Sequence, residues 1–379
     1  MSEISAVVNL TCGNDIRLAY YCWQFMVNSS KSSASPPRLM VLFGGQSAEH
    51  DVSRVTAKHV LQAVRAEQYE IVPIGIERDG TWNRVAVDTS TDALDTSGET
   101  IDPFSLMVDT AKAGGVVLSL LHGPMGEDGT IQGMCELANV AYVGAGVLGS
   151  ALAMDKIAAK HAFTSAGIPQ AAWFGFNADE ITDSTSANLL RELGSPVFVK
   201  PANMGSSVGV SRAETIEELD AALELAASYD EWIVVEEAIE GREIEIAVLG
   251  NREPKTSLPG EIVAGADFYT YEDKYHDGVA KLLIPAPLDD SEIAEMQQIA
   301  VAAFKALRVD GLARADFFYE PEGRGWLVNE LNTLPGFTPI SMYPKMWEAS
   351  GLSYPDLIDE LISLAFERHS RRVKNTDHE

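Results

Sequence analysis

Leu312-Ala-Arg-Ala-Asp-Phe-Phe-Tyr319 and Gly325-Trp-Leu-Val-Asn-Glu-Leu331 are two short segments rich in the branched and aromatic residues that strands favour. The segment between them, Glu320-Pro-Glu-Gly-Arg324, has the proline and glycine of a turn. We therefore predict a β-hairpin. Successive side chains of a strand point to opposite faces, so Arg314 and Asp316 should share one face of the first strand.

Glu330 and Asn332 should share a face of the partner strand in the same way. With Asp316 they supply two carboxylates and an amide oxygen, a set of hard ligands that suits Mg²⁺. The alternative is the solvent-facing polar side of a half-exposed hairpin. Asn332-Thr-Leu-Pro-Gly336 leads out of the hairpin, and Gly336 can present a backbone N–H where a Cβ would obstruct a ligand.

The first third of the chain alternates strand-like runs with helical patterns, which predicts an α/β arrangement around a parallel sheet. We expect strands at Leu39 to Phe43, Glu70 to Ile76, Val116 to Leu121 and Ala141 to Val143. Ser53 is expected to cap a helix from Arg54 to Ala66, and Thr130 a helix from Ile131 to Ala138.

The remaining chain mixes hairpins with helices. We expect helices at 155–166, 216–228, 291–307 and 355–368, and strands at 197–200, 208–212, 232–236 and 243–249. Gly167 and Pro169 end the first of these helices in the way that helix C-termini favour. A domain boundary is expected just before this helix.

Composition limits the kinds of partner. The 379 residues suggest two or three packed units, and 28 basic against 56 acidic residues give a net charge of -28. Such a charge argues against nucleic acid or an anionic membrane as partner. Cys12, Cys22 and Cys135 show neither a disulfide framework nor a zinc spacing, and no run of about 18 apolar residues occurs. We expect a cytoplasmic protein.

Residues 1–37 have no charged start, apolar core or cleavage site of a signal peptide. They end in Lys31-Ser-Ser-Ala-Ser-Pro-Pro37, which is typical of a polar linker. We interpret them as a flexible N-terminal extension, within which Met26 is an alternative start.

Two segments suggest a nucleotide site. Lys200-Pro-Ala-Asn-Met-Gly-Ser-Ser-Val-Gly209 puts a lysine at a strand end before a turn whose backbone amides can surround phosphate oxygens. It lacks Walker A spacing, and the alternative is an ordinary tight hairpin. Glu236-Glu-Ala-Ile239 ends an apolar strand and can offer its backbone to an adenine, with Glu243 near a ribose. Otherwise these are solvated acids at a domain joint.

Two loops after strands suggest a small substrate. Gly44-Gly-Gln-Ser-Ala-Glu49 and His122-Gly-Pro-Met-Gly-Glu-Asp-Gly129 fall at carboxyl ends of predicted parallel strands, where α/β proteins bind ligands. Glu49 and His122 are therefore candidates for substrate contacts, the alternative being solvated loop charges.

The segment Phe268 to Ala280 holds Tyr269, Tyr271, Lys274 and Tyr275 among acidic residues. It is either a surface excursion or a lid from which Lys274 reaches a terminal phosphate.

Taken in order, these motifs resemble the D-alanine:D-alanine ligases of the ATP-grasp superfamily, over about Leu39 to Ser341. The resemblance rests on Gly44 to Glu49, His122 to Gly129, Met154-Asp-Lys156, Lys200-Pro with Gly205 to Gly209, Lys274-Tyr275, Arg314-x-Asp316 and Glu330 to Gly336. It implies a three-domain fold, α/β and α+β, with a Rossmann-like parallel sheet at residues 38–145. The expected central domain is 146–239, the expected C-terminal catalytic domain is 240–372, and 373–379 form a tail.

The resemblance also implies an ATP site with two Mg²⁺ ions, for which Mn²⁺ can substitute. Asp316, Glu330 and Asn332 would hold the metals. The nucleotide would be met by Lys156, Lys200, Ser206, Ser207, Glu236, Glu237, Ile239, Glu243 and Lys274. Two positions differ from residues frequent in the family: Ala202-Asn-Met204 lacks a basic and an acidic residue, and Glu237 replaces a lysine.

By the same resemblance, the carboxylate of one D-alanine attacks ATP to give an acyl phosphate, which the amine of a second D-alanine displaces to form a dipeptide for cell-wall precursors. Glu49 and His122 would bind the first substrate, while Arg314 and Gly336 would stabilise the oxyanion. Ser341 and Met342 would bind the second substrate. Ser206 and Tyr275 would hydrogen-bond with Glu49, and Tyr275 favours an amine as acceptor. The protein is expected to be a homodimer.

Three alternatives remain open. Another ATP-grasp ligase would share the nucleotide residues but not Glu49, His122 and Ser341. A nicotinamide-dependent oxidoreductase is suggested by the glycines after the first strand, but the GxGxxG spacing is missing. A nucleotide-binding sensor without turnover would not require Arg314 and Lys274.

Overall fold

The computed structural model describes residues 36–263 and 281–372. The predicted lid residues Tyr269, Tyr271, Lys274 and Tyr275 lie outside the described residues, as do residues 1–35 of the predicted extension and the tail 373–379.

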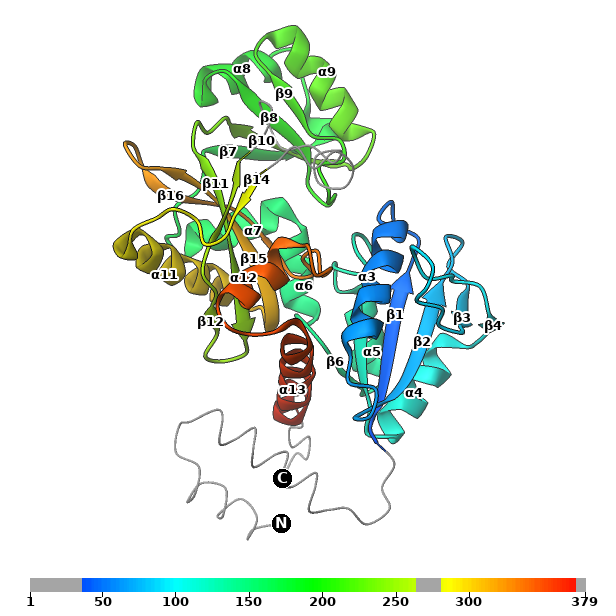
Figure 1. Cartoon of the computed structure of the whole chain (residues 1–379). Coiled ribbons are helices and arrows are strands. Elements are labelled where there is room, and N and C mark those ends of the chain that lie inside the picture. The colour runs from blue at the N-terminus through cyan, green and yellow to red at the C-terminus, as the bar shows by residue number, and fades with distance from the viewer. Residues whose placement is uncertain (1–35, 264–280, 373–379) are drawn as a thin grey trace, which may run out of the picture. The chain divides into compact units, whose positions relative to one another are not determined.

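The first sheet has the strand order β4-β3-β2-β1-β5-β6 (Figure 1). Its parallel part is formed by β1 (Arg38–Gly44), β2 (Glu70–Ile76), β5 (Val116–Ser119) and β6 (Ala141–Tyr142). β3 (Trp82–Arg84) and β4 (Glu99–Thr100) extend it in antiparallel pairing. Helices α3 (His50–Ala63), α4 (Pro103–Lys112) and α5 (Thr130–Leu137) complete the unit. The predicted α/β arrangement is therefore confirmed.

The predicted helix caps at Ser53 and Thr130 are wrong. α3 begins at His50 with Glu49 at its N-cap, and Ser53 lies inside the helix. The Ser53 hydroxyl donates to the carbonyl of Leu120 at 2.5 Å and accepts from the backbone N–H of Gly44 at 2.9 Å, so it joins two strand ends. Local propensity marked a capping residue, but tertiary contacts decide its use.

Thr130 is the first residue of α5, and the N-cap is Gly129, with φ 97°. The carboxylate of Asp128 accepts the backbone N–H of Thr130 at 2.9 Å. Because an aspartate two positions upstream already satisfies this N–H, the threonine side chain is not needed as a cap.

The second sheet is antiparallel, with the order β7-β10-β8-β9. Its strands are β7 (Trp173–Asn177), β8 (Val197–Pro201), β9 (Ser211–Ala213) and β10 (Trp232–Glu237), accompanied by the short η1 (Ala178–Glu180), α8 (Thr185–Leu193) and α9 (Ile216–Ala227). The hairpin predicted around the 201–210 turn is confirmed. Its second strand begins only at Ser211, because 208–210 still belong to the turn region.

The third sheet has the order β14-β13-β11-β15-β16, and β12 also pairs with β11. Its strands are β11 (Arg242–Gly250), β12 (Lys255–Thr256), β13 (Gly260–Val263), β14 (Lys281–Leu283), β15 (Gly311–Glu320) and β16 (Gly325–Asn332). Its helices are α11 (Asp290–Ala306), α12 (Met342–Ala349) and α13 (Tyr354–Arg372). The predicted hairpin is confirmed as β15 and β16, with Asp316 opposite Glu330 and Arg314 opposite Asn332.

The hairpin contains a β-bulge. Asp316 pairs with Glu330 and Phe317 pairs with Val328, so Asn329 is an extra residue on β16. Asn329 and Glu330 are both partly exposed, whereas strict alternation would bury one of them. The bulge thus places the polar side chain of Asn329 next to that of Glu330, at the edge of the predicted metal cluster.

The hydrophobic cores explain how the sheets are held. Helices cover both faces of the first sheet: α3 packs on one face with Val41, and α4 and α5 pack on the other with Met40. The second sheet has its own core with α8 and α9. α6 (Val147–Met154) and α7 (Lys156–Ser165) lead from the first sheet to the second, and Phe163 of α7 is buried with Phe304 and Phe317 of the third unit.

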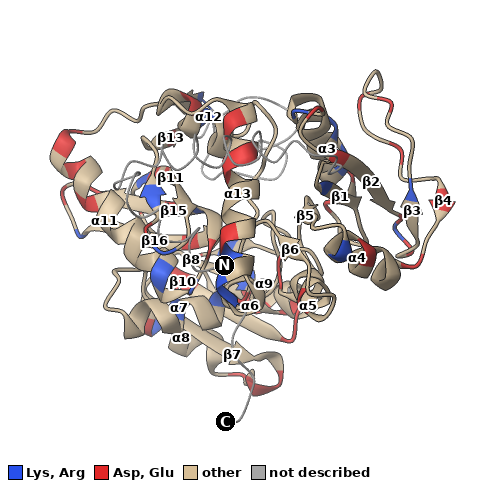
Figure 2. Cartoon of the chain, turned by 90° about the horizontal axis from the view of Figure 1, so that it is seen from below, with Lys and Arg blue, Asp and Glu red and all other residues tan. Residues whose placement is uncertain are grey.

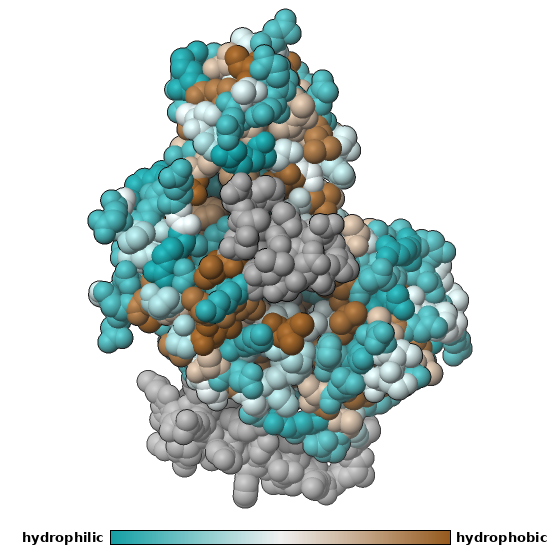
Figure 3. Space-filling model, turned by 45° about the horizontal axis from the view of Figure 1, so that its top comes forward, coloured by the Kyte–Doolittle hydropathy of each residue, from teal (hydrophilic) through white to brown (hydrophobic). Residues whose placement is uncertain are grey.

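The surface is mainly hydrophilic in the view of Figure 3, with hydrophobic residues in small separate areas. Acidic residues are spread over many elements, among them β4, α11 and α13 (Figure 2). Among the described residues, no helix is both long and apolar enough to cross a membrane.

Gly126 gives a direct test of the loop that follows β5. A Cβ at this position would overlap the carbonyl oxygen of Leu121, which is backbone and cannot move aside cheaply. We expect Gly126→Ala to lower the free energy of unfolding by about 3 kcal/mol. Gly133→Ala in α5 is the matched control, because its Cβ would meet nothing within 4 Å. That control should gain up to about 1 kcal/mol from helix propensity, and equal melting temperatures for the two variants would contradict the expectation.

Candidate active site

The polar face of the β15–β16 hairpin forms a compact charged cluster. Arg314 donates through Nε and Nη2 to the two carboxylate oxygens of Asp316, each at 2.6 Å. Asn332 Nδ2 donates to Asp316 Oδ2 at 2.9 Å and to Glu330 Oε1 at 3.4 Å. Glu245, which lies opposite Asp316 on β11, places Oε2 3.1 Å from Arg314 Nε. The predicted metal ligands are thus brought together, with Arg314 bonded to one of them.

The donor set fits a magnesium ion. Carboxylate and amide oxygens are hard ligands, and Asp316, Glu330 and Asn332 carry them on adjacent strands. Asn332 directs its Nδ2 at the two carboxylates, so its amide would have to turn over to offer its oxygen to a metal ion. Among residues 36–263 and 281–372, no three His, Cys, Asp or Glu side chains alone form a metal site. Metal binding here would require the amide of Asn332, substrate oxygens, and a shift of Arg314 from Asp316.

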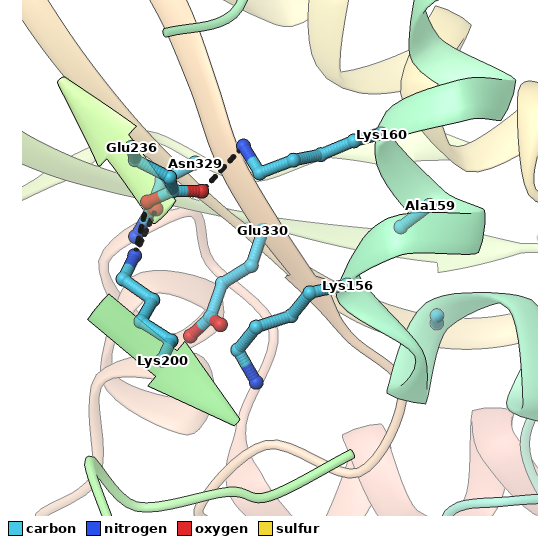
Figure 4. A pocket seen from close by; sticks show the side chains of 8 residues that line it. Lys156, Ala159, Lys160, Lys200, Glu236, Asn329 and Glu330 are labelled. Atoms are coloured by element: carbon cyan, nitrogen blue, oxygen red, sulfur yellow. Dashed lines mark hydrogen bonds and ion pairs between the residues drawn. The ribbon is translucent and has the colours of Figure 1, made fainter. Parts of the chain in front are cut away.

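Three lysines meet in a pocket between α7, β8, β10 and β16 (Figure 4). Its polar lining consists of Lys156, Lys160, Lys200, Glu236, Asn329 and Glu330. The two oxygens of Glu236 each contact a lysine, Lys160 Nζ at 2.6 Å and Lys200 Nζ at 2.5 Å. Burial alone would raise the pKa of Glu236, but the two ammonium groups outweigh it and lower the pKa to about 2.

Lys156 and Lys200 are the predicted phosphate ligands, and both are near Glu330. Burial lowers the pKa of Lys156 although Glu330 opposes the shift. For Lys200, burial also acts downward, but Glu236 outweighs it and the pKa is raised. Lys156 Nζ donates to the carbonyl of Met204 at 2.6 Å, which ties the start of α7 to the turn after β8.

That turn brings Ser206 to the first sheet's loop. Ser206 and Ser207 have φ of 51° and 59°, a left-handed conformation that is unusual for residues other than glycine. In this conformation Ser206 Oγ donates to Glu49 Oε1 at 2.5 Å. The predicted bond between Ser206 and Glu49 is present, while the predicted third member of this set, Tyr275, lies outside the described residues.

Glycines surround the other oxygen of Glu49. A Cβ at Gly123 would lie 2.9 Å from Glu49 Oε2, and one at Gly205 would lie 3.3 Å from it. The Glu49 side chain is 9% exposed, and His122 beside it is 4% exposed. Glycine at these two positions therefore places no side chain against this oxygen of a largely buried carboxylate.

His122 and Glu127 are perturbed by this environment. Burial lowers the pKa of His122 despite the nearby Glu49 charge, so its neutral form is favoured. Burial, followed by the Glu49 charge, raises the pKa of Glu127 from 4.5 to about 8. Glu127 Oε1 accepts the backbone N–H of Gly123 at 2.6 Å, which fixes the loop that carries His122.

Glu127 predicts a pH dependence of stability. Between 4.5 and about 8 the folded chain holds a proton on Glu127 that the unfolded chain has lost. Its contribution to stability is therefore fully present below about pH 4.5 and is lost as pH rises through about 8. In Glu127→Gln, which can still accept from Gly123, we expect the melting temperature to fall less between about pH 5 and pH 8 than in the wild type. If the melting temperatures of the two proteins changed equally between these pH values, the raised pKa of Glu127 would be contradicted.

The predicted adenine segment, Glu236 to Ile239, begins with the last two residues of β10 and continues beyond the strand. The carboxylate of Glu237 accepts from the backbone N–H of Ala172 and from Arg324, each at 2.6 Å, so this side chain holds neighbouring elements together. Its backbone N–H donates to the carbonyl of Ala172 at 3.0 Å. Ile239 and Glu243 are partly exposed, and the Glu243 charge acts on Lys200.

The turn after β16 carries the predicted acceptor residues. A Cβ at Gly336 would lie 3.1 Å from Ser341 Oγ, so glycine keeps this approach open. Ser341 Oγ lies 2.8 Å from Thr338 Oγ1 and is at the N-cap of α12. The Met342 side chain is buried in the core, 7% exposed, and its role as a substrate contact stays a prediction.

Four residues of this region were not singled out from the sequence: Lys160, Glu245, Asn329 and Glu127. Lys160 follows Lys156 by four positions on one helix, and Glu245 follows Glu243 by two on one strand. Those spacings put the two members of each pair on the same face of the helix or strand, so Lys160 and Glu245 could have been predicted from Lys156 and Glu243. No such spacing predicts Asn329, because only the bulge turns it toward Lys200, whose Nζ is 3.4 Å from its Oδ1.

A helix-covered parallel sheet is followed by two antiparallel sheets that face each other across buried lysines and a hairpin of oxygen ligands. This combination defines an ATP-grasp ligase. Two family models match the chain, the D-ala D-ala ligase N-terminus at residues 38–145 and the D-ala D-ala ligase C-terminus at residues 162–363. The chain therefore belongs to the D-alanine–D-alanine ligase family.

Known relatives agree with this assignment. The D-alanine–D-alanine ligase of Bacillus velezensis is 48% identical over 354 residues, covering 88% of this chain and 100% of that protein. The solved ligase from Coxiella burnetii is 36% identical, with a TM-score of 0.75, 89% of this chain and 96% of that chain covered. The VanG D-Ala:D-Ser ligase from Enterococcus faecalis is 34% identical, with a TM-score of 0.75, 87% of this chain and 100% of that one covered.

Proposed function

We propose that this protein joins two D-alanine molecules with ATP, releasing ADP and phosphate, to make D-alanyl-D-alanine for peptidoglycan precursors. Family membership over most of the chain supports the ligase activity. The observation that carries the substrate is the largely buried Glu49 carboxylate beside Gly123 and Gly205, because a carboxylate can accept from a substrate ammonium group and neither glycine places a side chain against its Oε2.

In the first step, Glu49 binds the ammonium group of one D-alanine, with Ser206 orienting the carboxylate and His122 enclosing the small side chain. A substrate carboxylate oxygen then attacks the terminal phosphorus of ATP, and ADP leaves. Lys156, Lys200 and Lys274 neutralise the phosphate charge during this transfer, which requires positioning more than covalent help from the protein.

In the second step, the amine of another D-alanine attacks the acyl carbon and phosphate leaves. Arg314 and the backbone N–H of Gly336 stabilise the oxyanion that forms. Ser341 and the N-terminus of α12 at Met342 bind the carboxylate of this second substrate. Tyr275, next to Lys274 in the chain, supports an amine as acceptor.

The nucleotide contacts follow the same arrangement. The segment Glu236, Glu237 and Ile239 lies along the adenine, and Glu243 meets the ribose. The backbone N–H groups of Ser206 and Ser207 donate to phosphate. Asp316, Glu330 and Asn332 would hold two Mg²⁺ or Mn²⁺ ions. Such ions draw charge from phosphate oxygens and so make the phosphorus easier to attack.

We also propose a cytoplasmic homodimer with domains at 38–145, 146–239 and 240–372, after an extension at 1–37 and before a tail at 373–379. The three sheets support these boundaries, since their strands span 38–142, 173–237 and 242–332. Phe163 of α7 is buried with Phe304 of α11 and Phe317 of β15, so the beginning of the proposed central domain packs against the third sheet and its helix.

The test is phosphate release from ATP and Mg²⁺ with D-alanine, L-alanine, D-serine or D-lactate added. Stimulation by D-alanine alone, with a dipeptide product in mass spectrometry, is the expected result. D-serine joined to D-alanine at comparable rates would instead favour the acceptor named for the Enterococcus faecalis relative. Absence of stimulation by D-alanine would overturn the proposed substrate.

A further inference from the structure

Glu236 is bound by two lysines that differ in their surroundings. The Lys160 side chain comes from α7 and is 3% exposed, whereas the Lys200 side chain comes from β8 and is 14% exposed. Figure 4 shows Lys160 reaching Glu236 from the helix and Lys200 reaching it from the opposite side. Lys200 also contacts Asn329 at 3.4 Å and lines the pocket together with Glu330.

The two lysines therefore have different freedom to change partner. Lys200 is the proposed phosphate ligand, so a bound phosphate competes with Glu236 for its ammonium group. A carboxylate that is 4% exposed cannot lose all its counter-ions without a large penalty. Lys160 lies on the other carboxylate oxygen and can stay there while Lys200 moves.

We propose that Lys160 is a positioning residue of the nucleotide site: the fixed counter-ion of Glu236, which allows Lys200 to transfer from Glu236 to a nucleotide phosphate. This inference rests on the proposed function, because it takes the ligand of Lys200 to be ATP. Lys160 itself touches no nucleotide in this arrangement. Its effect reaches ATP through the charge balance of Glu236.

A structural ion pair makes different predictions. If Lys160 only stabilises the fold, its loss should lower the melting temperature and leave ATP affinity unchanged. If Lys160 holds Glu236 so that Lys200 is available, its loss should weaken ATP specifically. Without Lys160, Lys200 is the remaining ammonium group on Glu236, and phosphate must compete with a buried carboxylate for it.

The experiment measures binding of a non-hydrolysable ATP analogue by calorimetry in the absence of amino acid, together with steady-state kinetics. For Lys160→Met we expect about tenfold weaker analogue binding and a similar rise in KM for ATP, with KM for D-alanine changed less than about twofold. Lys160→Arg keeps the charge and should retain most of the affinity. Lys112→Met, an exposed lysine on α4 paired with Asp109, is the matched control.

A double-mutant cycle tests whether Lys160 acts through Glu236. Glutamine at 236 needs no counter-ion, so Lys160→Met should cost little affinity in a Glu236→Gln background. Should Lys160→Met fail to fold, Lys160→Gln takes its place, with a smaller loss because its amide can still donate to Glu236. The double-mutant cycle is then measured with Lys160→Gln in both the wild-type and the Glu236→Gln backgrounds.

Each outcome has a defined meaning. Wild-type protein that fails to bind the analogue overturns the proposed function. Wild-type binding with unchanged affinity in Lys160→Met, even at a lower melting temperature, overturns the role of Lys160 alone. An equal loss in the Glu236→Gln background also overturns it, because Lys160 would then act on the nucleotide without Glu236.

Discussion

Arg314→Met is expected to lower kcat by about 10²- to 10³-fold, equivalent to about 3 to 4 kcal/mol, as loss of one oxyanion donor does in other enzymes. The guanidinium is largely buried, with its side chain 17% exposed. It contacts Glu245 as well as Asp316, so it keeps one buried carboxylate partner when a metal ion takes the oxygens of Asp316. Its loss should affect the reacting state far more than the binding of ATP.

The same variant should bind Mg²⁺ more readily. Arg314 occupies both oxygens of Asp316, and Asp316 is a proposed metal ligand, so arginine and metal compete for one carboxylate. Without Arg314, Asp316, Glu245 and Glu330 repel one another, and a divalent ion relieves that repulsion. Added Mg²⁺ should therefore raise the melting temperature of Arg314→Met more than that of the wild type.

Arg212→Met is the matched control, because Arg212 pairs with Glu214 at the exposed edge of the second sheet. It should leave both kcat and the Mg²⁺ response unchanged. Arg314→Met with kcat within about threefold of the wild type would contradict the oxyanion role. An unaltered Mg²⁺ response would show that arginine and metal do not compete for Asp316.

The hairpin could be predicted because its alternation and its turn are local in sequence. Arg314 and Asp316 lie two residues apart, and period-2 patterning puts them on one face whatever the rest of the chain does. Asn329 could not be predicted, since a bulge inserts a residue without changing composition. Strict alternation fails at one position, and that position borders the lysine pocket.

Contacts between distant segments set the limit of sequence reasoning. The motifs predict that Lys156 and Lys200 bind phosphate, but the partners that these lysines have in the structure come from distant parts of the chain. Ser53 shows the same limit: it follows the rule for a cap, yet it links Gly44 to Leu120 because the fold brings two strand ends together. Local sequence rules predict which residues make polar contacts, but the packing of distant segments determines their partners.

Glu330→Gln should lower kcat by at least about 10³-fold, because a charged metal ligand contributes several kcal/mol of charge stabilisation in the reacting state. Two physical effects add here. A neutral amide binds Mg²⁺ less tightly than a carboxylate does. Glu330 also favours the protonated form of Lys156, whose pKa burial lowers, so its loss should lower the pKa of Lys156 further.

The measurement is initial rate against Mg²⁺ concentration, with metal binding followed separately by calorimetry in the presence of ADP. Half-saturation should move to higher Mg²⁺ in Glu330→Gln, and excess metal should restore part of the rate. Glu320→Gln is the control, since it makes the same chemical change on β15 at a residue paired with Arg324 outside the cluster. If both variants needed the same Mg²⁺ concentration as the wild type, Glu330 would not be a metal ligand. The lysine effect would then remain as the cause of any loss, and it would be recognised by a rate that falls as pH rises while metal affinity stays constant.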